Sequence, residues 1–526
     1  MRFGFIALAA VLLLIGGACG ALLLSATDIR IGAVLADPYI RHVLGFTFWQ
    51  AGLSALLSVG LAIPVARAFA RQARFPGRRL LLRIFLMPMV TPVIVAVFGI
   101  VAVHGQSGWI TRALGAAGVP PDHYVYGLTG ILIAHLFFNL PLATRLLLQA
   151  WDTVPGETWR LAQQLGLGSG TIFRLIEWPL LRERLPGTAM LVFLLCFVSF
   201  ATVLALGGGP AATTLEVAIY QALRFDFDLD RAVTLALLQT LFCGALLLFA
   251  HRFALPLPPS AGLGRAIERD DRRLPGALVL DGASIFAACL IVLLPLLATV
   301  IDGLAGPIVP TLADPVIMRG LLYSLGIALM AGFGTTFIAL GLAHLIRGCH
   351  ARPRLVPAAS LVELAGMATV LLSPLALGTG FFLLLRSAAM MQPVALAAVM
   401  LINALMAMPY AMRILVPAML TAAREQDRLC AALGLSGWNR WRLIDWPGLR
   451  RPIGMAFGFA AALSAGDLGA IALFGGPGTA TLPLLLYQQL GAYRVEEAAV
   501  TALLLLLVSL GLYSLIERGV GGHASA

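Results

Sequence analysis

Long apolar runs separated by short polar segments dominate the hydrophobic pattern of this chain. A run of about 20 mostly apolar residues can cross a bilayer as one helix, and twelve runs meet this criterion, six in each half. In the first half they cover residues 3–24, 44–66, 84–104, 125–149, 187–206 and 232–251. In the second half they cover residues 276–301, 320–346, 358–385, 394–417, 453–474 and 498–517. The pattern predicts an all-α integral membrane protein with about twelve transmembrane helices, some of which contain Pro or Gly.

The composition agrees with a membrane protein and excludes some enzyme classes. Charged residues make up 12% of the chain, about half of what an ordinary soluble domain carries. All 36 basic residues are arginine, so the chain cannot supply the lysine of a Walker A loop or of a Schiff base. The six cysteines lie mostly in apolar runs without the spacing of metal ligands, and we expect neither a metal site nor a cofactor.

The arginines predict the orientation of the chain in the membrane. If the N-terminus lies inside and the runs alternate, 28 of the 36 arginines fall in cytoplasmic segments. This bias follows the positive-inside rule and predicts that both termini are cytoplasmic. The net charge of +11 therefore indicates basic cytoplasmic loops and not nucleic-acid binding. The polar, proline-flanked segment 256–274 is predicted to be a cytoplasmic linker between two domains, residues 1–255 and 275–526.

The two halves share an internal repeat. Residues 157–182 and 425–450 are identical at 13 of 26 positions without a gap, and both lie in predicted cytoplasmic loops between the fourth and fifth spans of their half. The halves therefore have the same orientation, as parallel repeats related by an axis along the membrane normal. A translocation path between them is the natural consequence.

Each copy of the repeat combines two short helices. The first is amphipathic and is expected to end or bend at a glycine, Gly166 or Gly434. The second is expected to stop at a Trp-Pro pair before the next span. A cytoplasmic helix with one apolar stripe suits a groove on a partner protein, and the alternative is a helix that lies on the lipid surface.

These segments resemble the coupling motif of ATP-binding-cassette importer permeases, E-A-A-x3-G-x9-I-x-L-P. The residues that fit it are Ala162, Gly166, Ile176 and Pro179 in the first copy and Gly434, Ile444 and Pro447 in the second. The departures are Arg160 and Arg428 at the motif's Glu position, and Trp178 and Trp446 at its Leu. Glu157 and Glu425 lie three residues earlier, almost one turn away. The resemblance implies that both segments contact an ATPase.

The chain as a whole resembles the fused, two-half permeases of bacterial thiamine importers. The stretches that carry this resemblance are residues 46–59, 199–223, 401–411 and 481–494. It implies a type I importer fold in the inner membrane, which moves thiamine and its phosphate esters inward. It also implies two copies of an ABC ATPase in the cytoplasm and a periplasmic thiamine-binding protein, which we expect near residues 207–230 and 475–497.

Five residues are candidates for contact with a cationic, aromatic substrate. Glu363 and Asp467 are acids inside predicted spans, where charges are costly and often functional. Glu216, Tyr220 and Tyr487 lie in predicted outer loops. Each has a structural alternative: an acid can end a helix or pair with a polar neighbour, and a tyrosine can belong to the interfacial aromatic belt.

Two other transport functions remain open at this point. Fused permeases for ferric iron share the two-half layout and resemble the chain more weakly. A proton-coupled secondary transporter with twelve spans would need a relay of buried acids, and the spans contain few. No catalytic arrangement of Ser, His and Asp or of paired carboxylates stands out, so we do not expect an enzyme.

Overall fold

The computed structural model describes residues 2–25, 31–118, 124–251, 271, 275–385, 392–476 and 478–520, and every regular element within these residues is a helix. The predicted linker 256–274 lies outside the described residues except for Asp271, which pairs with Arg71 at 3.8 Å. The all-α prediction is confirmed.

Nine helical segments are long and apolar enough to cross a membrane, counted among the described residues. They are Arg2–Ser25 (α1), Pro38–Arg71 (α3), Val93–Ala116 (α6 and α7), Leu128–Trp151 (α8), Leu229–Phe249 (in α14), Gly276–Ala305 (in α15), Pro315–His350 (α17), Pro393–Ala432 (in α20) and Val495–Ser514 (in α25). The complete helices are α14 (Leu229–His251), α15 (Pro275–Ala305), α20 (Gln392–Ala432) and α25 (Val495–Val520). Each corresponds to one predicted span.

The third and fifth spans of each half are broken into shorter helices, which the hydrophobic pattern does not predict. In the first half the pieces are α5 (Met87–Val90) with α6 (Val93–His104), and α11 (Trp178–Phe197) with α12 (Ala201–Leu206). In the second half they are α18 (Val356–Met367) and η5 (Ala368–Leu371) with α19 (Pro374–Leu385), and α22 (Trp446–Ala465) with α23 (Gly469–Phe474). The predicted spans 84–104, 187–206, 358–385 and 453–474 are therefore wrong as single continuous helices.

Proline and side-chain capping explain three of the four breaks. Pro92 and Pro374 have no N–H to donate and push the preceding residue out of the helical region; Thr91, for example, is extended, with ψ 125°. The Asp467 carboxylate accepts hydrogen bonds from the N–H groups of Gly469 (3.2 Å) and Ala470 (3.0 Å), and so starts α23 as an N-cap does.

The first span of each half packs on the opposite half. Helix α1 lies against α17 and α19, whereas α15 lies against α6 and α3 of the first half and also against α25 of its own half. The first helices of the two halves are therefore exchanged: α1 packs mainly with the second half of the sequence, and α15 packs mainly with the first half.

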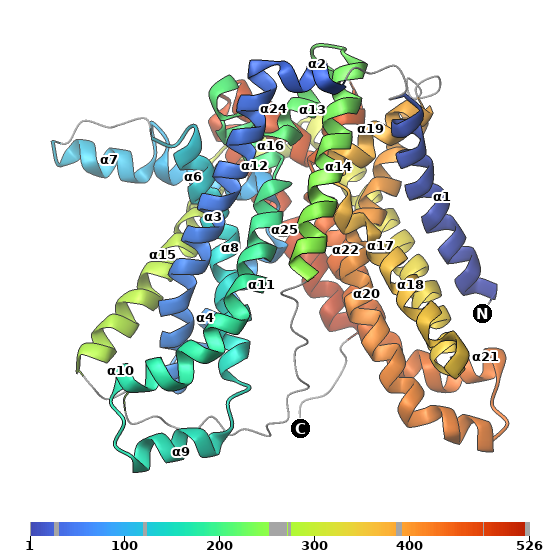
Figure 1. Cartoon of the computed structure of the whole chain (residues 1–526). Coiled ribbons are helices and arrows are strands. Elements are labelled where there is room, and N and C mark those ends of the chain that lie inside the picture. The colour runs from blue at the N-terminus through green and yellow to red at the C-terminus, as the bar shows by residue number, and fades with distance from the viewer. Residues whose placement is uncertain are drawn as a thin grey trace.

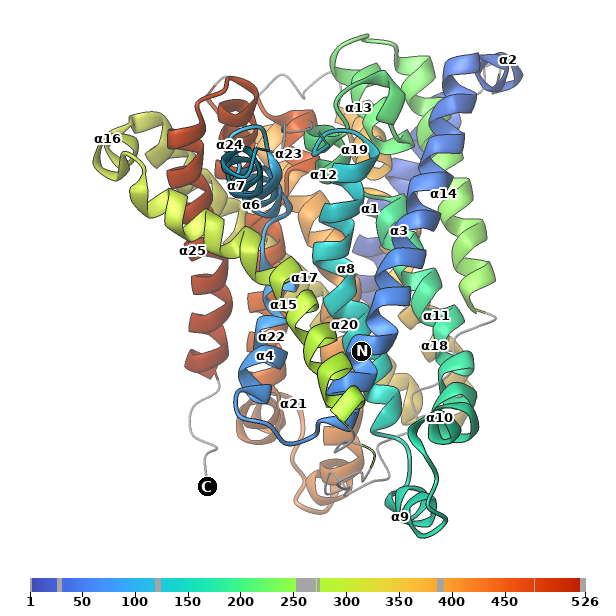
Figure 2. The same cartoon turned by 90° about the vertical axis from the view of Figure 1, so that its left-hand side faces the viewer.

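The two repeat segments lie at the same end of the bundle, on opposite sides of it (Figures 1 and 2). At that end are α4 (Arg78–Ile84), α9 (Gly156–Gln164), α10 (Ser169–Ile172) and α21 (Gly437–Arg440), and α25 ends on the same side (Figure 1). The opposite end carries α2 (Ile31–Ala36), α13 (Leu215–Arg224), α16 (Ile308–Ala313) and α24 (Leu482–Gly491). The ribbons of the two halves lie close at the second end and diverge toward the first (Figure 1).

Candidate functional site

The first repeat segment begins with α9, a separate amphipathic helix, and ends it at Gly166. This glycine has φ +61°, a left-handed conformation that favours glycine. Its N–H donates to the carbonyl of Gln163, and the N–H of Leu167 donates to the carbonyl of Ala162, both at 3.0 Å. This is a Schellman cap, and it confirms the predicted end of the helix.

The second segment ends in the same way but begins differently. Gly434 has φ +66°, and the N–H of Leu435 donates to the carbonyl of Cys430 at 2.9 Å. The helix that ends there is α20 itself, which continues without a break for 41 residues from Gln392 to Ala432. In the first half a turn at Asp152–Pro155 separates α8 from α9.

The expectation that Trp-Pro stops a second short helix is wrong. One widened turn, η1 (Phe173–Glu177) or η6 (Trp441–Asp445), instead leads directly into α11 or α22. The N–H of Trp178 donates to the carbonyl five residues earlier. Because proline has no N–H for the carbonyl four residues before it, a π turn at this point accommodates Pro179 in the first turn of the long helix.

The predicted coupling residues divide into an exposed set and a packed set. The exposed residues are Glu157, Arg160, Gly166, Glu425, Arg428, Gly434 and Pro447. Ala162 is buried, and Ile176, Pro179 and Ile444 are half-buried. Ala162 and the two isoleucines thus hold the segments to the bundle, whereas the charged positions, both glycines and Pro447 face outward.

Large apolar side chains are exposed at matched positions of the two segments. They are Leu161, Leu165, Leu175 and Trp178 in the first copy and Leu429, Leu433, Leu443 and Trp446 in the second, with exposed fractions of 44–63%. Each pair is separated by the same 268 positions. Two equivalent apolar surfaces flanked by arginines therefore face away from the bundle at one end.

A buried ion pair anchors the first segment to the second span. Arg67, near the end of α3, places Nε 2.7 Å from Oε2 of Glu177, which is fully buried in η1. The Trp151 indole N–H donates to the other carboxylate oxygen at 3.2 Å. Arg67 also donates to the carbonyl of Ser169 at 3.0 Å and lies 4.8 Å from the centroid of the Phe173 ring. One arginine therefore fixes α10 and the π turn together.

The second segment has an equivalent but larger anchor. Arg347 of α17 lies 2.9 Å from Asp445 in η6 and 2.5 Å from Asp427 near the end of α20. Arg440 of α21 pairs with both aspartates, at 3.3 Å from Asp445. The one sequence signal for these anchors is an acid at the same repeat position, Glu177 or Asp445. Arg67 lies 110 positions from Glu177 and Arg347 lies 98 positions from Asp445, so no local pattern predicts these two pairs.

The structure brings four of the five substrate candidates toward the region where the halves meet. Glu216 is buried and accepts a hydrogen bond from Gln239 at 3.1 Å. The Tyr220 ring packs edge-on against Phe200, with centroids 5.3 Å apart.

Tyr487, on the equivalent helix α24, is half-buried and close enough to Tyr220 for the two to interact electrostatically. Asp467 caps α23 at the break of its span and keeps part of its surface exposed. Glu363 is separate: it is exposed on α18, beside the exposed side chains of Leu361 and Leu364.

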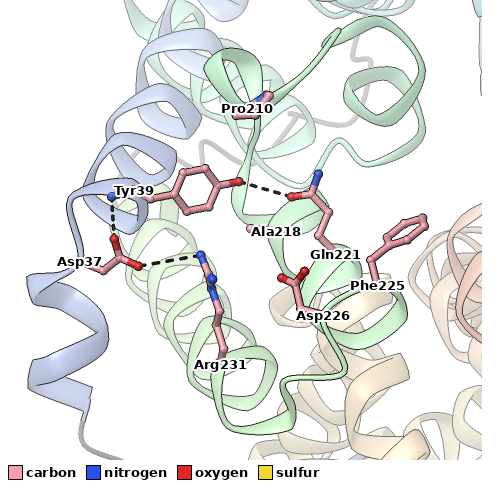
Figure 3. Close-up of a pocket in the computed structure, with 8 residues that line it drawn as sticks. All are labelled: Asp37, Tyr39, Pro210, Ala218, Gln221, Phe225, Asp226 and Arg231. Carbon is pink, nitrogen blue, oxygen red and sulfur yellow. Dashed lines mark hydrogen bonds and ion pairs between the residues drawn. The ribbon is translucent and has the colours of Figure 1, made fainter.

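A pocket of about 550 Å³ lies beside α13 near the end of the molecule opposite the repeat segments (Figure 3). Tyr39 donates to Gln221 at 3.3 Å, and Arg231 lies 4.0 Å from Asp37 and 5.2 Å from the centroid of the Tyr39 ring. Asp226 adds a second carboxylate to the lining. These residues come from distant parts of the chain, which is why the sequence does not reveal the pocket.

Comparison with known proteins identifies full-length relatives. The chain is 46% identical to the thiamine transport system permease protein ThiP of Escherichia coli K12, over 92% of this chain and 90% of that protein. It is 43% identical to ThiP of Brucella abortus strain 2308, over 99% and 96%. A putative ferric transport system permease protein, FbpB 1 of Haemophilus influenzae, is 26% identical over 47% of this chain.

No family model matches the chain. The level of identity over nearly the whole length of the ThiP relatives nevertheless decides the classification, because the ferric relative matches less than half of the chain. The chain belongs to the family of thiamine transport system permease proteins.

Proposed function

We propose that this multi-pass membrane protein is the permease subunit of an ATP-driven importer that carries thiamine and its phosphate esters into the cytoplasm. Its membrane is the bacterial inner membrane, with both termini and both repeat segments in the cytoplasm. The full-length likeness to ThiP proteins supports thiamine over ferric iron as the substrate.

The paired apolar surfaces of the repeat segments are the observation that carries the coupling mechanism. A helix lying on lipid would not need a buried ion pair behind it, whereas a surface that transmits force must be held rigidly to the bundle. Both surfaces are so held, by Arg67 and by Arg347. We place one copy of an ABC ATPase on each, with Leu161 and Leu165 or Leu429 and Leu433 in its groove.

The arginines of the coupling surface set the charge that the ATPase must match. Arg160 and Arg428 are exposed beside the leucines, at the position where the resembling motif has Glu. An acidic lining in the ATPase groove would complement them. Glu157 and Glu425, almost one turn away, are exposed as well and are available for a separate contact with a basic residue.

The opposite end of the molecule is where we place the periplasmic thiamine-binding protein. The pocket beside α13 supplies half-buried polar groups from α3, α13 and α14, together with the exposed Asp226 (Figure 3). Closure of the ATPases would move the two segments together, and the halves would then separate at the outer end, as alternating access requires.

The experiment that tests the proposed function is thiamine uptake into proteoliposomes that hold the permease, its ATPase and its binding protein. We expect uptake to require ATP and to survive collapse of the proton gradient. Uptake that follows the proton gradient without ATP would replace this proposal with a secondary transporter.

A glycine variant tests the role of the segments within the same assay. Gly434 has φ +66°, and no atom would obstruct a β-carbon there, so only backbone conformation opposes substitution. A left-handed conformation costs a β-branched residue roughly 1–2 kcal/mol and Asn much less. Gly434→Val should therefore lower uptake several-fold while Gly434→Asn does not, and equal uptake by the two variants would show that the shape of this cap is unimportant for coupling.

A further inference from the structure

The four helix breaks meet at the junction between the halves. A β-carbon at Gly466, in the break of the eleventh span, would lie 2.8 Å from Cβ of Pro92, in the break of the third. A β-carbon at Gly469 would lie 3.5 Å from Cβ of Pro374 and 3.9 Å from the Phe200 ring. Breaks from both halves are therefore in direct contact, at the place where discontinuous helices of other transporters form substrate sites.

Helix α13 packs at this junction and carries a buried carboxylate. Glu216 is 0% exposed, and α13 packs against α14 of its own half and against α19 and α23 of the other. The hydroxyl of Ser373, which also caps α19, faces Glu216 from the second half. Tyr220 lies one turn later, so it shares a face with Glu216 and packs on Phe200.

The groups that face Glu216 in this buried cluster, Gln239 and Ser373, are neutral. Gln239 donates to Oε1 of Glu216, but Oε2 has no hydrogen-bond partner. Oε1 of Gln239 and Oγ1 of Thr214 are also buried without a partner. The closest arginine on α13, Arg224, donates to the carbonyl of Gly475 in the other half at 2.9 Å. A buried carboxylate that only neutral groups such as Gln239 and Ser373 face is costly, and the cost falls when a cation reaches it.

We propose that Glu216 and Tyr220, with Phe200 and Ser373, form a binding site for the thiazolium cation of thiamine at the junction of the halves. The site opens when the halves separate at the outer end and the hydrogen bond from Arg224 to the carbonyl of Gly475 breaks. The carboxylate pairs with the permanent positive charge, and the rings of Tyr220 and Phe200 present aromatic faces to it. This inference rests on the proposed function, because it takes thiamine as the substrate.

If the proposed cation site is correct, thiamine transport requires the negative charge of Glu216 and not only the shape of its side chain. Glu216→Gln keeps the size of the side chain and can still pair with Gln239, but it removes the negative charge. In the reconstituted importer we expect this variant to lower thiamine transport at least tenfold. ATP hydrolysis stimulated by the thiamine-loaded binding protein should stay within about twofold of wild type, because the coupling segments are untouched.

Two matched variants separate binding from structure. Glu216→Asp restores the charge and should recover part of the transport, whereas Glu363→Gln removes an acid that lies apart from the junction and should transport as wild type does. If Glu216→Gln transports thiamine normally, the site is wrong. If Glu216→Gln and Glu216→Asp both lower the thermal unfolding midpoint, transport and ATP hydrolysis together, Glu216 is a structural group and the proposal is overturned.

Different experimental results would refute the proposed function and the proposed cation site. If the wild-type complex does not take up thiamine, the substrate assignment is wrong whatever the Glu216 variants do. If the wild type transports thiamine and Glu216→Gln equals it, only the cation site is refuted.

Discussion

The two coupling segments have nearly the same sequence motif but are attached to the bundle in different ways. The first is α9, which follows a turn at Asp152–Pro155 and is held through the pair of Arg67 with Glu177. The second continues directly from α20 and is held by Arg347 and Arg440 together. Where the first half has Pro155-Gly156, the second has Ala423-Arg424, two good helix formers. The first segment is therefore hinged, and the second is a rigid extension of its span.

This difference teaches how one fused chain can couple to two copies of the same ATPase. A rigid α20 transmits a displacement of its cytoplasmic end directly to its transmembrane part. A hinged α9 transmits it through the Arg67–Glu177 pair to α3 and α11. Equal movements of two ATPases are thus expected to reach the two halves through different elements.

Removal of Arg347 should have the largest effect on stability of the variants that compare the two segments. Arg347→Met leaves two aspartates facing Arg440 alone, and breaking a buried pair in this way costs roughly 3–5 kcal/mol in the free energy of unfolding. Arg67→Met leaves Glu177 its hydrogen bond from the Trp151 indole N–H and should cost less. Denaturant unfolding of both variants in detergent measures the difference, with Arg347→Met/Asp445→Asn as the control that should regain part of the loss. Equal losses in the two halves would contradict the difference in anchoring.

A proline placed in the rigid helix should make it resemble the hinged one. Ala423→Pro removes a helical hydrogen bond inside α20 and should cost about 3 kcal/mol of stability. It should also reduce thiamine transported per ATP hydrolysed, because the kink separates the coupling end from the span. The matched change Pro155→Ala should shift stability by no more than about 0.5 kcal/mol. If Ala423→Pro transports with normal efficiency, rigidity of α20 is not needed for coupling.

One exposed tryptophan predicts a difference in how the two segments bind the ATPase. Trp438 is 72% exposed in the second segment, and its counterpart in the first is Gly170. Tryptophans at interfaces often contribute about 2 kcal/mol, roughly 30-fold in affinity. Trp438→Ala should weaken ATPase binding by this amount without changing the unfolding midpoint, and Asn439→Ala is the neighbouring control. Unchanged affinity would place Trp438 outside the interface.

The sequence predicts the features of the fold that a few neighbouring residues determine. The apolar runs predict the positions of the nine spans found among the described residues, and the glycine spacing predicts the left-handed caps at Gly166 and Gly434. The coupling-segment repeat also predicts the parallel relation of the halves. These features need only a few neighbouring residues to form.

The features that the sequence does not reveal depend on residues far apart in the chain, or on a single side chain within an apolar run. The break at Phe200 has apolar residues on both sides and therefore reads as one continuous span. Asp467 reads as a buried charge, whereas the structure uses it to begin a helix. Arg67–Glu177 and Arg347–Asp445 join residues more than 90 positions apart, and the exchange of the first spans is a property of packing alone.

The number of ATPase copies bound to each permease tests the central claim most directly. Native mass spectrometry of the purified complex should show two ATPases on the wild type, one on Leu165→Asp or Leu433→Asp, and none on the double variant. Both leucines are exposed, so the substitutions should not disturb folding. Two ATPases retained by the double variant would contradict the assignment of these surfaces as the ATPase contacts.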